Sequence, residues 1–330
     1  MKTMILKRNL FICVALATLF LAACKNEDIV ISREVSFEVI PYAAVSDFAR
    51  YEVNPGDLTN FKFSSHPEMF KLRTYILVYD AEGILVNSKI EDLKNFNEKM
   101  TASFELSDGV YNVVSLAHIY FESDDIAYWY VDNIDCLDSL KVINNDKYYD
   151  TWIKQLGLQS MSIEVGHGSE NYVMNLQSAV ALMVNYFHNI HYYPTIFAYL
   201  PYANKMPSMI AFDAEGEYQA SYEESEELDY PLTSPFVVAE ESNNVYWYYC
   251  FTPLQTTSFG WFGVANDGQV HSLGTRSANI QAGKVFRSVV NLQSGSFEIE
   301  ELKNNKELPC LSNNCKILIT KNKESKNKKN

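Results

Sequence analysis

Short apolar runs separated by turn residues dominate the chain. The segment REVSFEVIPY (33–42) alternates apolar Val35, Phe37 and Val39 with mostly polar neighbours, which predicts a half-buried strand. The segment 72–90 (LRTYILVYDAEGILVNSKI) joins two apolar runs through Asp-Ala-Glu-Gly. It predicts a hairpin in which Gly83 takes a positive φ.

The same pattern continues along the chain. The segment 102–119 (ASFELSDGVYNVVSLAHI) predicts a second hairpin turning at 107–109, and further strand-length runs follow one another from 171 to 300. The best helical candidate is 139–158, although Asn144-Asn145-Asp146 interrupts it. Strand-length runs with regularly spaced turns favour a β-sandwich, so the fold class we expect is all-β with minor α content.

The two halves of the chain resemble each other. LSDGVYNVVSL near the end of the first half and IQAGKVFRSVVNL near the end of the second share a turn, a glycine, an aromatic residue and paired β-branched residues. We interpret this as two sandwich domains, 33–170 and 171–300, joined near Gly166-His167-Gly168-Ser169. Chance similarity between ordinary β-strands is the open alternative.

The amino-terminal residues predict export. Lys2, Lys7 and Arg8 precede an apolar stretch from Leu10 to Leu21, which is typical of a signal peptide and too short for a transmembrane helix. Leu-Ala-Ala-Cys at 21–24 resembles the lipobox of bacterial lipoproteins. The resemblance implies a signal peptide at 1–23, lipidation of Cys24 and a tether at 24–32.

One feature of the tether leaves two alternatives open. Lys25-Asn26-Glu27-Asp28 is similar to the surface-export signal of Bacteroidota lipoproteins, and a plain solvated linker explains it equally well. A lipid anchor would make the outer membrane one partner of the protein. The expected location is therefore the cell outer membrane, exposed at the surface.

Charge is unevenly distributed. The whole chain carries −14, residues 24–300 carry −22, and the lysine-rich tail 301–330 carries +5. A body this acidic argues against nucleic acid as a partner. The acidic run 215–233 is typical of a solvated loop and lacks the spacing of a calcium-binding loop.

Catalytic and metal-binding patterns are absent from the sequence. His188 and His191 would point to opposite faces of a strand, and His118 follows an apolar strand as a domain-edge residue. We therefore expect no enzyme, no cofactor and no metal. Cys310 and Cys315 lie five residues apart and could form a disulfide.

Clustered aromatic residues at 128–132, 245–251 and 259–263 offer a binding alternative. Trp and Tyr stack on sugar rings, but strand alternation directs half of each cluster into a core. A surface glycan-binding lipoprotein that uses Trp247 or Trp261 is thus one alternative function. A host or glycan ligand stays unidentified.

Several motifs together resemble the fimbrillin superfamily, and specifically the FimB/Mfa-type lipoproteins of Bacteroidota that anchor a fimbrium. They are YILVYDAEGILV (75–86), FELSDGVYNVVSLAHI (104–119), IQAGKVFRSVVNL in the second half, and the lipobox. Leu116-Ala117-His118 departs from the family pattern that follows the valine pair. The departure bears on the subfamily more than on the fold.

The resemblance implies two tandem transthyretin-like sandwiches, fimbrial subunits as partners and assembly by β-strand donation. An anchor or accessory subunit would keep its lipid and its first strand, 35–42. Cleavage after Arg50 would instead give a proteolytically matured stalk or tip subunit. Arg50 is also explained as an ordinary loop residue.

Overall fold

The computed structural model describes residues 32–41, 70–94, 98–121, 126–145, 155–166, 170–204, 207, 209–221, 229–231, 236–237, 244–251, 257–302 and 316–317. Most of them lie in strands, and one short 3₁₀ helix, η2 (Leu137–Ser139), connects two of the strands. The fold is therefore an all-β sandwich architecture, as the hydrophobic pattern predicts.

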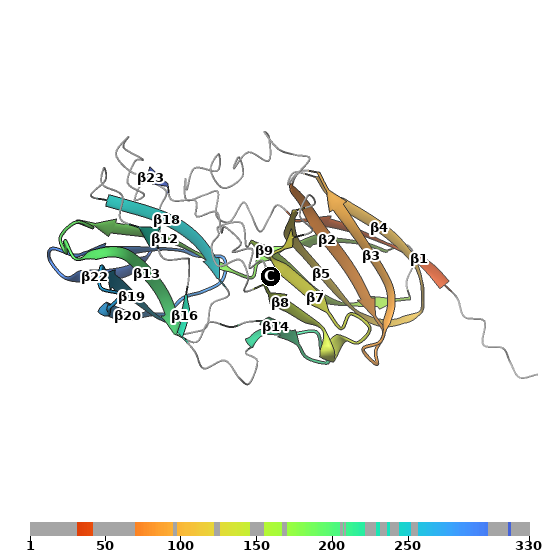
Figure 1. Cartoon of the computed structure of the whole chain (residues 1–330). Helices are drawn as coiled ribbons and strands as arrows, with labels where there is room; N and C mark the ends of the chain where they lie inside the picture. Colours follow the sequence, from red (N-terminus) through yellow and green to blue (C-terminus); the bar gives the residue numbers. More distant parts are fainter. Residues whose placement is uncertain are drawn as a thin grey trace, which may run out of the picture.

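The first half of the chain contributes to three sheets (Figure 1). Sheet A has the order β10 (Glu170–Asn175), β1 (Ser32–Ile40), β4 (Met100–Ser107). Sheet B has the order β11 (Gln177–Ser178), β9 (Leu156–Val165), β5 (Gly109–Phe121), β2 (Phe70–Tyr79), β3 (Leu85–Leu93), and β6 (Ile126–Ala127) also pairs with β5. Sheet C has the order β15 (Tyr218–Ser221), β14 (Met209–Phe212), β8 (Lys141–Asn144), β7 (Trp129–Asp132).

Sheet B lies between the other two, and its strand β2 is buried on both faces. Ile76 and Val78 of β2 belong to the core shared with sheet A, whereas Leu77 and Tyr79 belong to the core shared with sheet C. All four side chains are fully buried. A strand covered on both sides needs an unbroken apolar run, and this explains YILVY at 75–79.

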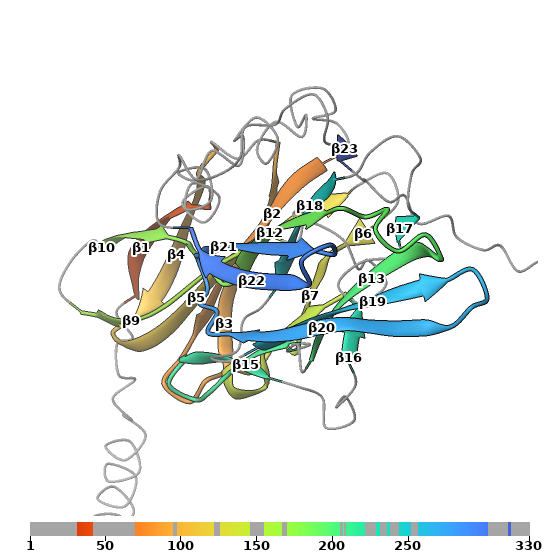
Figure 2. The same cartoon turned by 90° about the vertical axis from the view of Figure 1, so that its left-hand side faces the viewer.

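The second half forms a two-layer sandwich, which faces the viewer in Figure 2 with one layer above the other. Sheet D has the order β22 (Ser296–Glu301), β21 (Val285–Asn291), β12 (Ala181–His188), β18 (Asn244–Phe251), β23 (Lys316–Ile317). Sheet E has the order β16 (Asp229–Pro231), β13 (Ile196–Asn204), β19 (Thr257–Ala265), β20 (Val270–Ala278), and β17 (Phe236–Val237) also pairs with β13. Phe187 and Trp261 meet in the core between these sheets, with ring centroids 4.5 Å apart.

Sheet C joins the two halves of the chain. Strand β14 comes from the second half, yet it pairs with β8 of the first half, with Ile210 opposite Val142. Strand β10, at the start of the second half, pairs with β1. The sheets thus exchange strands across the sequence midpoint, and the predicted division at 170/171 stays a prediction.

The predicted hairpin at 72–90 is confirmed. Strands β2 and β3 pair antiparallel, and Gly83 takes φ +77° in the turn. The Asp80 carboxylate accepts hydrogen bonds from the backbone N–H groups of Glu82 and Ile84 at 3.1 and 2.8 Å. A short side chain such as aspartate stabilises a tight turn because its carboxylate accepts hydrogen bonds from backbone N–H groups that have no backbone acceptor in the turn.

The predicted hairpin at 102–119 is wrong. Strand β4 pairs with β1 in sheet A, while β5 pairs with β2 and β9 in sheet B, so the chain changes sheets at Asp108. Asp108 is held at this corner by Arg33 of β1, with 2.7 Å between Nε and Oδ1. The turn residues fit both geometries, and only the partner strands decide between them.

The helix predicted at 139–158 is wrong in its described parts. Residues 141–144 form β8 and residues 156–158 begin β9. Val142 packs in the core of sheets B and C, and Leu156 and Leu158 pack in the same core. Pairing with distant strands therefore overrides the local helical pattern.

Candidate strand-exchange site

The amino-terminal strand β1 is the centre of sheet A and has a neighbour on each side. It pairs antiparallel with β4, from Ser32 opposite Ser107 to Val39 opposite Met100. It pairs in parallel with β10, from Val35 opposite Glu170 to Ile40 opposite Asn175. The backbone of β1 therefore satisfies the inner edges of both neighbours.

The inward side chains of β1 complete a hydrophobic core. Val35, Phe37 and Val39 are 0–2% exposed and pack in the core between sheets A and B. The Phe37 ring lies 6.0 Å from the Phe104 ring of β4 and 5.6 Å from the Tyr172 ring of β10. The core therefore uses β1 as a structural member of the sheet.

The energy of this insertion is large relative to the stability of a domain. Burying a Val or Phe side chain contributes about 1.5–3 kcal/mol, so these three side chains contribute roughly 5–9 kcal/mol as an upper estimate. Whole domains are stable by only about 5–15 kcal/mol. A body without β1 would thus leave an apolar groove with two unpaired strand edges, which another strand could fill.

Polar contacts fasten β1 at both ends. Arg33 Nε donates to Asp108 Oδ1 at 2.7 Å, and Lys99 Nζ donates to Glu38 Oε1 at 2.8 Å. The hydrogen bond to Asp108 raises the pKa of Arg33. These pairs are exposed and contribute little free energy each, so they fix the register of β1 more than its affinity.

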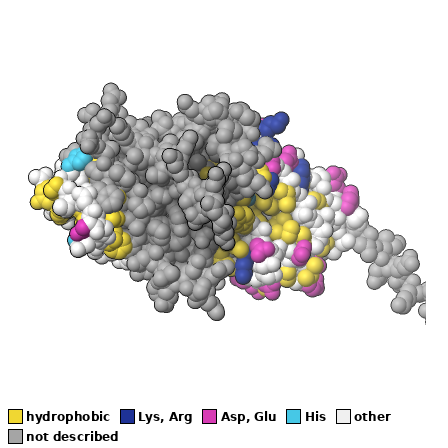
Figure 3. Space-filling view, viewed as in Figure 1, with side chains coloured by type: hydrophobic (Ala, Val, Ile, Leu, Met, Phe, Trp, Pro, Cys, Tyr) yellow, Lys and Arg dark blue, Asp and Glu magenta, His cyan; other side chains and the backbone are white. Residues whose placement is uncertain are grey.

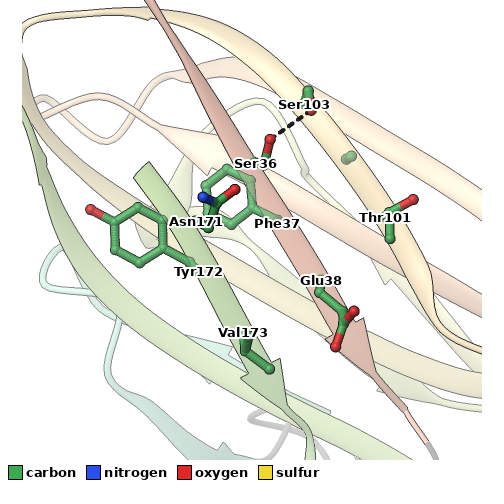
Figure 4. A pocket seen from close by; sticks show the side chains of 9 residues that line it. Ser36, Phe37, Glu38, Thr101, Ser103, Asn171, Tyr172 and Val173 are labelled. Carbon is green, nitrogen blue, oxygen red and sulfur yellow. Dashed lines mark hydrogen bonds between the residues drawn. The ribbon is translucent and has the colours of Figure 1, made fainter. Parts of the chain in front are cut away.

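The outward face of sheet A carries small polar side chains around a shallow depression of about 390 Å³ (Figure 4). Ser36 and Ser103, which are hydrogen-bonded through their hydroxyls at 2.8 Å, line it together with Glu38, Thr101 and Val173. Beside it, the Tyr172 hydroxyl donates to Glu170. Burial, with a smaller effect of Glu170, raises the pKa of Tyr172 to about 12, which keeps this hydroxyl protonated.

The predicted site residues flank this strand in the sequence. Cys24 precedes Ser32 by eight residues, and Arg50 follows Ile40 by ten. Cys24, Arg50, Cys310 and Cys315 all lie outside the described residues. Lipidation, cleavage and the disulfide therefore stay predictions, whereas the strand predicted at 35–42 corresponds to β1 (Ser32–Ile40).

His118 lies inside the first half and is not at a domain edge. It is 1% exposed in β5, its ring stacks on Tyr75 at 5.8 Å, and its Nδ1 lies 3.2 Å from the Ile119 carbonyl oxygen. Burial lowers the pKa of His118 to about 4, so the ring is neutral at pH 7. Its position follows from the central place of β5 in sheet B, which the local sequence does not reveal.

The remaining candidates are also placed. Trp261 is 2% exposed and packs against Phe187, so it presents no face for a sugar, contrary to the glycan-binding alternative at this residue. The side chain of Trp247 lies outside the described ones. Within the described ranges, no group of three His, Cys, Asp or Glu side chains could hold a metal ion.

The contribution of β10 to this site does not follow from the sequence. The predicted division at 170/171 places residues 171–175 in the second domain, and ENYVMN (170–175) alternates in the way expected of a half-buried strand. The alternation identifies a strand but not its partner. The parallel pairing with β1 is a tertiary contact between residues more than 130 positions apart.

No protein-family model matches the chain, and no curated protein sequence does. Among solved structures, the chain is similar to a candidate adhesin from Bacteroides thetaiotaomicron, with 9% identity, a TM-score of 0.48, and coverage of 83% of this chain and 97% of the other. It is also similar to two fimbrial proteins of Porphyromonas gingivalis. They are the tip protein Mfa3 (8% identity, TM-score 0.43, coverage 82% and 99%) and the anchor protein Mfa2 (11%, 0.40, 82% and 95%). Sequence identities and TM-scores this low carry no statement about the function of this chain.

Among the described residues, no helix is long and apolar enough to cross a membrane. The predicted signal peptide lies outside the described residues.

Proposed function

We propose that this protein is an outer-membrane lipoprotein of the fimbrillin type, held through a lipid on Cys24, that anchors or joins a cell-surface fimbrium. One observation carries the proposal: the strand that follows the lipobox cysteine, β1, fills the centre of sheet A. A lipid on Cys24 would thus be linked through the seven residues 25–31 to a structural strand. The proposal assigns no catalytic activity, cofactor or metal to the chain.

Strand donation explains why the first strand matters for assembly. A chain that keeps β1 has the groove of sheet A filled and cannot accept a strand there from another subunit. Such a subunit ends the polymer at the membrane, which is the role of an anchor. Fimbrial subunits are the partners that this mechanism requires.

The alternative is a stalk or tip subunit matured by cleavage after Arg50. It has the same physical basis, because β1 is joined to β2 only through residues 41–69. Loss of β1 after that cut would open the groove to the strand of a neighbour. The two roles therefore differ in whether β1 is retained.

The first test is the amino terminus of the protein purified from its native membrane. The anchor role predicts a mature chain that begins with acylated Cys24. It also predicts that palmitate labelling disappears in the Cys24→Ala variant. A chain that begins at Tyr51 would contradict the anchor role and favour the polymerising subunit, and labelling that persists in the variant would exclude lipidation at Cys24.

A further inference from the structure

The turn between β12 and β13 displays aromatic side chains to solvent. Five consecutive residues, from His191 to Thr195, are exposed, although they lie between the buried Ile190 and Ile196. Tyr192 is 50% exposed and Tyr193 is 38% exposed, and their rings meet edge to face with centroids 5.1 Å apart. The two rings support each other, and both keep accessible surface.

The turn is held in place before any ligand binds. Asn189 takes φ +58°, and its carbonyl accepts the backbone N–H of Tyr192 at 2.9 Å. The Asn189 side-chain amide donates to Asn291 Oδ1 at 3.0 Å, and the Asn266 N–H donates to the Thr195 carbonyl at 2.9 Å. Two neighbouring turns therefore fix this one. A fixed aromatic platform loses little conformational entropy when it binds.

The three turns form the far tip of the second half, at 189–195, 266–269 and 292–295. Their only acidic or basic residue, histidine aside, is Asp267, and the others include Asn, Gln, Ser, Thr and Tyr. By contrast, the body of residues 24–300 carries −22. On the face shown in Figure 3, acidic side chains gather on the first half, whereas the far end of the second half shows histidine and hydrophobic side chains with little acidic surface. The tip is therefore suited to a neutral ligand.

The size of the tip separates two kinds of partner. Its exposed residues, 191–195, 266–269 and 293–295, number twelve. A stable protein interface uses about 20–30 residues on each side. A sugar ring needs less: an aromatic face against its C–H groups, and nearby amides and hydroxyls for its hydroxyl groups. The described tip matches the second set of requirements.

We propose that this tip, centred on Tyr192 and Tyr193, binds a neutral carbohydrate. Figure 1 shows that it lies at the end of the molecule opposite β1. A protein tethered before β1 would thus present the sugar-binding surface at the end remote from its tether. This inference goes beyond the anchoring role and does not depend on lipidation or on strand donation.

The test uses the full chain, purified in detergent, on an array of mammalian mucin-type and N-linked glycans and plant polysaccharides. The parent protein binds at least one neutral glycan. Tyr192→Ala and Tyr193→Ala each weaken that binding roughly tenfold, whereas Tyr192→Phe and Tyr193→Phe retain most of it because stacking persists. Tyr218→Ala, at a tyrosine of matching exposure (39%) on β15, leaves binding unchanged. Thermal unfolding confirms that every variant is folded.

Three outcomes would overturn the proposal. In the first outcome, the parent protein binds none of the glycans. In the second, the Tyr218→Ala control loses as much binding as the tip variants do. In the third outcome, the protein binds mucin and still binds it after the glycans of the mucin have been removed enzymatically. That result would identify a protein partner instead. Because palmitate labelling and the amino terminus are measured separately, failure here is distinguishable from failure of the anchoring role.

Discussion

At the scale of single residues, the polar group around His118 shows how a buried side chain is kept neutral. Arg73 donates to both carboxylate oxygens of Asp92, at 2.7 and 2.8 Å, and its guanidinium lies 3.7 Å from the centre of the Tyr120 ring. This bonding lowers the pKa of Asp92. His118 lies nearby without a carboxylate partner of its own in the described structure, so burial dominates and its pKa falls to about 4.

The charge state of His118 predicts a pH dependence of stability. In the unfolded chain a histidine has a pKa near 6.5, about 2.5 units above the folded value. The unfolded chain therefore binds more protons between these values, and stability falls as pH drops from about 6.5 towards 4. Replacing His118 with Gln removes this part of the dependence. Urea unfolding at pH 7, 6 and 5 should show a smaller loss of stability in the variant than in the parent.

Other groups affect both proteins alike in that comparison. The hydrogen bonds from Arg73 hold the pKa of Asp92 below its ordinary value, and so its effect on stability lies below the pH window of the measurement. An identical pH dependence in parent and variant would mean that His118 is protonated inside the fold.

At the scale of elements, β1 attaches the amino terminus to the body non-covalently, through strand pairing and packing. Its pairing on both edges and its three buried side chains do not depend on the connection to β2. A cut in that connection therefore does not by itself release the body from whatever precedes β1. Cleavage after Arg50 would therefore give a matured stalk or tip subunit only if β1 also left the sheet.

A specific protease site substituted at residues 55–61 tests whether β1 is held non-covalently. After cleavage, the fragment that carries β1 should stay with the body through gel filtration at neutral pH and separate only in denaturant. Phe37→Ala should weaken the association of β1 with the body by about 3–5 kcal/mol, so the cut variant should lose the fragment without denaturant. Glu34→Gln, on the exposed face of the same strand, is the control that should behave like the parent. Immediate loss of the fragment from the parent would show that the connection, not the sheet, holds β1.

At the scale of the whole molecule, the β14–β15 hairpin ties the two halves together. Its residues lie in the second half of the sequence, while Ile210 and Phe212 are buried in the core that also holds Leu137, Leu140 and Val142. Leu182 and Val285 of sheet D reach the same core. We therefore expect the halves to unfold as one cooperative unit.

Ile210→Ala tests that coupling across the molecule. Truncation of a buried isoleucine costs about 2–5 kcal/mol, and the loss should reach β8, because Ile210 lies opposite Val142. Hydrogen exchange should therefore rise in residues 141–144 as well as in 209–212. Val270→Ala, at a valine 61% exposed on β20, is the matched control and should leave both segments protected. Increased exchange confined to 209–212 would show that the hairpin is only a local attachment.

The sequence by itself determined the local features of this protein. Alternation identified β1 with its inward Val35, Phe37 and Val39, and the continuous run at 75–79 with Asp80 and Gly83 identified the β2–β3 hairpin. These patterns are local because side-chain alternation and turn geometry depend on neighbouring residues. The lipobox at Cys24 is likewise a local pattern, and it stays a prediction.

Only the tertiary structure decided which strands pair. The turn at Asp108 is compatible with a hairpin and with a change of sheet. The local pattern of 139–144 predicts a helix, whereas pairing with β14 makes residues 141–144 a strand. The burial of Trp261 and His118 and the exposure of Tyr192 depend in the same way on the sheets around them. Sequence patterns state that a residue prefers a covered face, but contacts between distant segments determine which faces are covered.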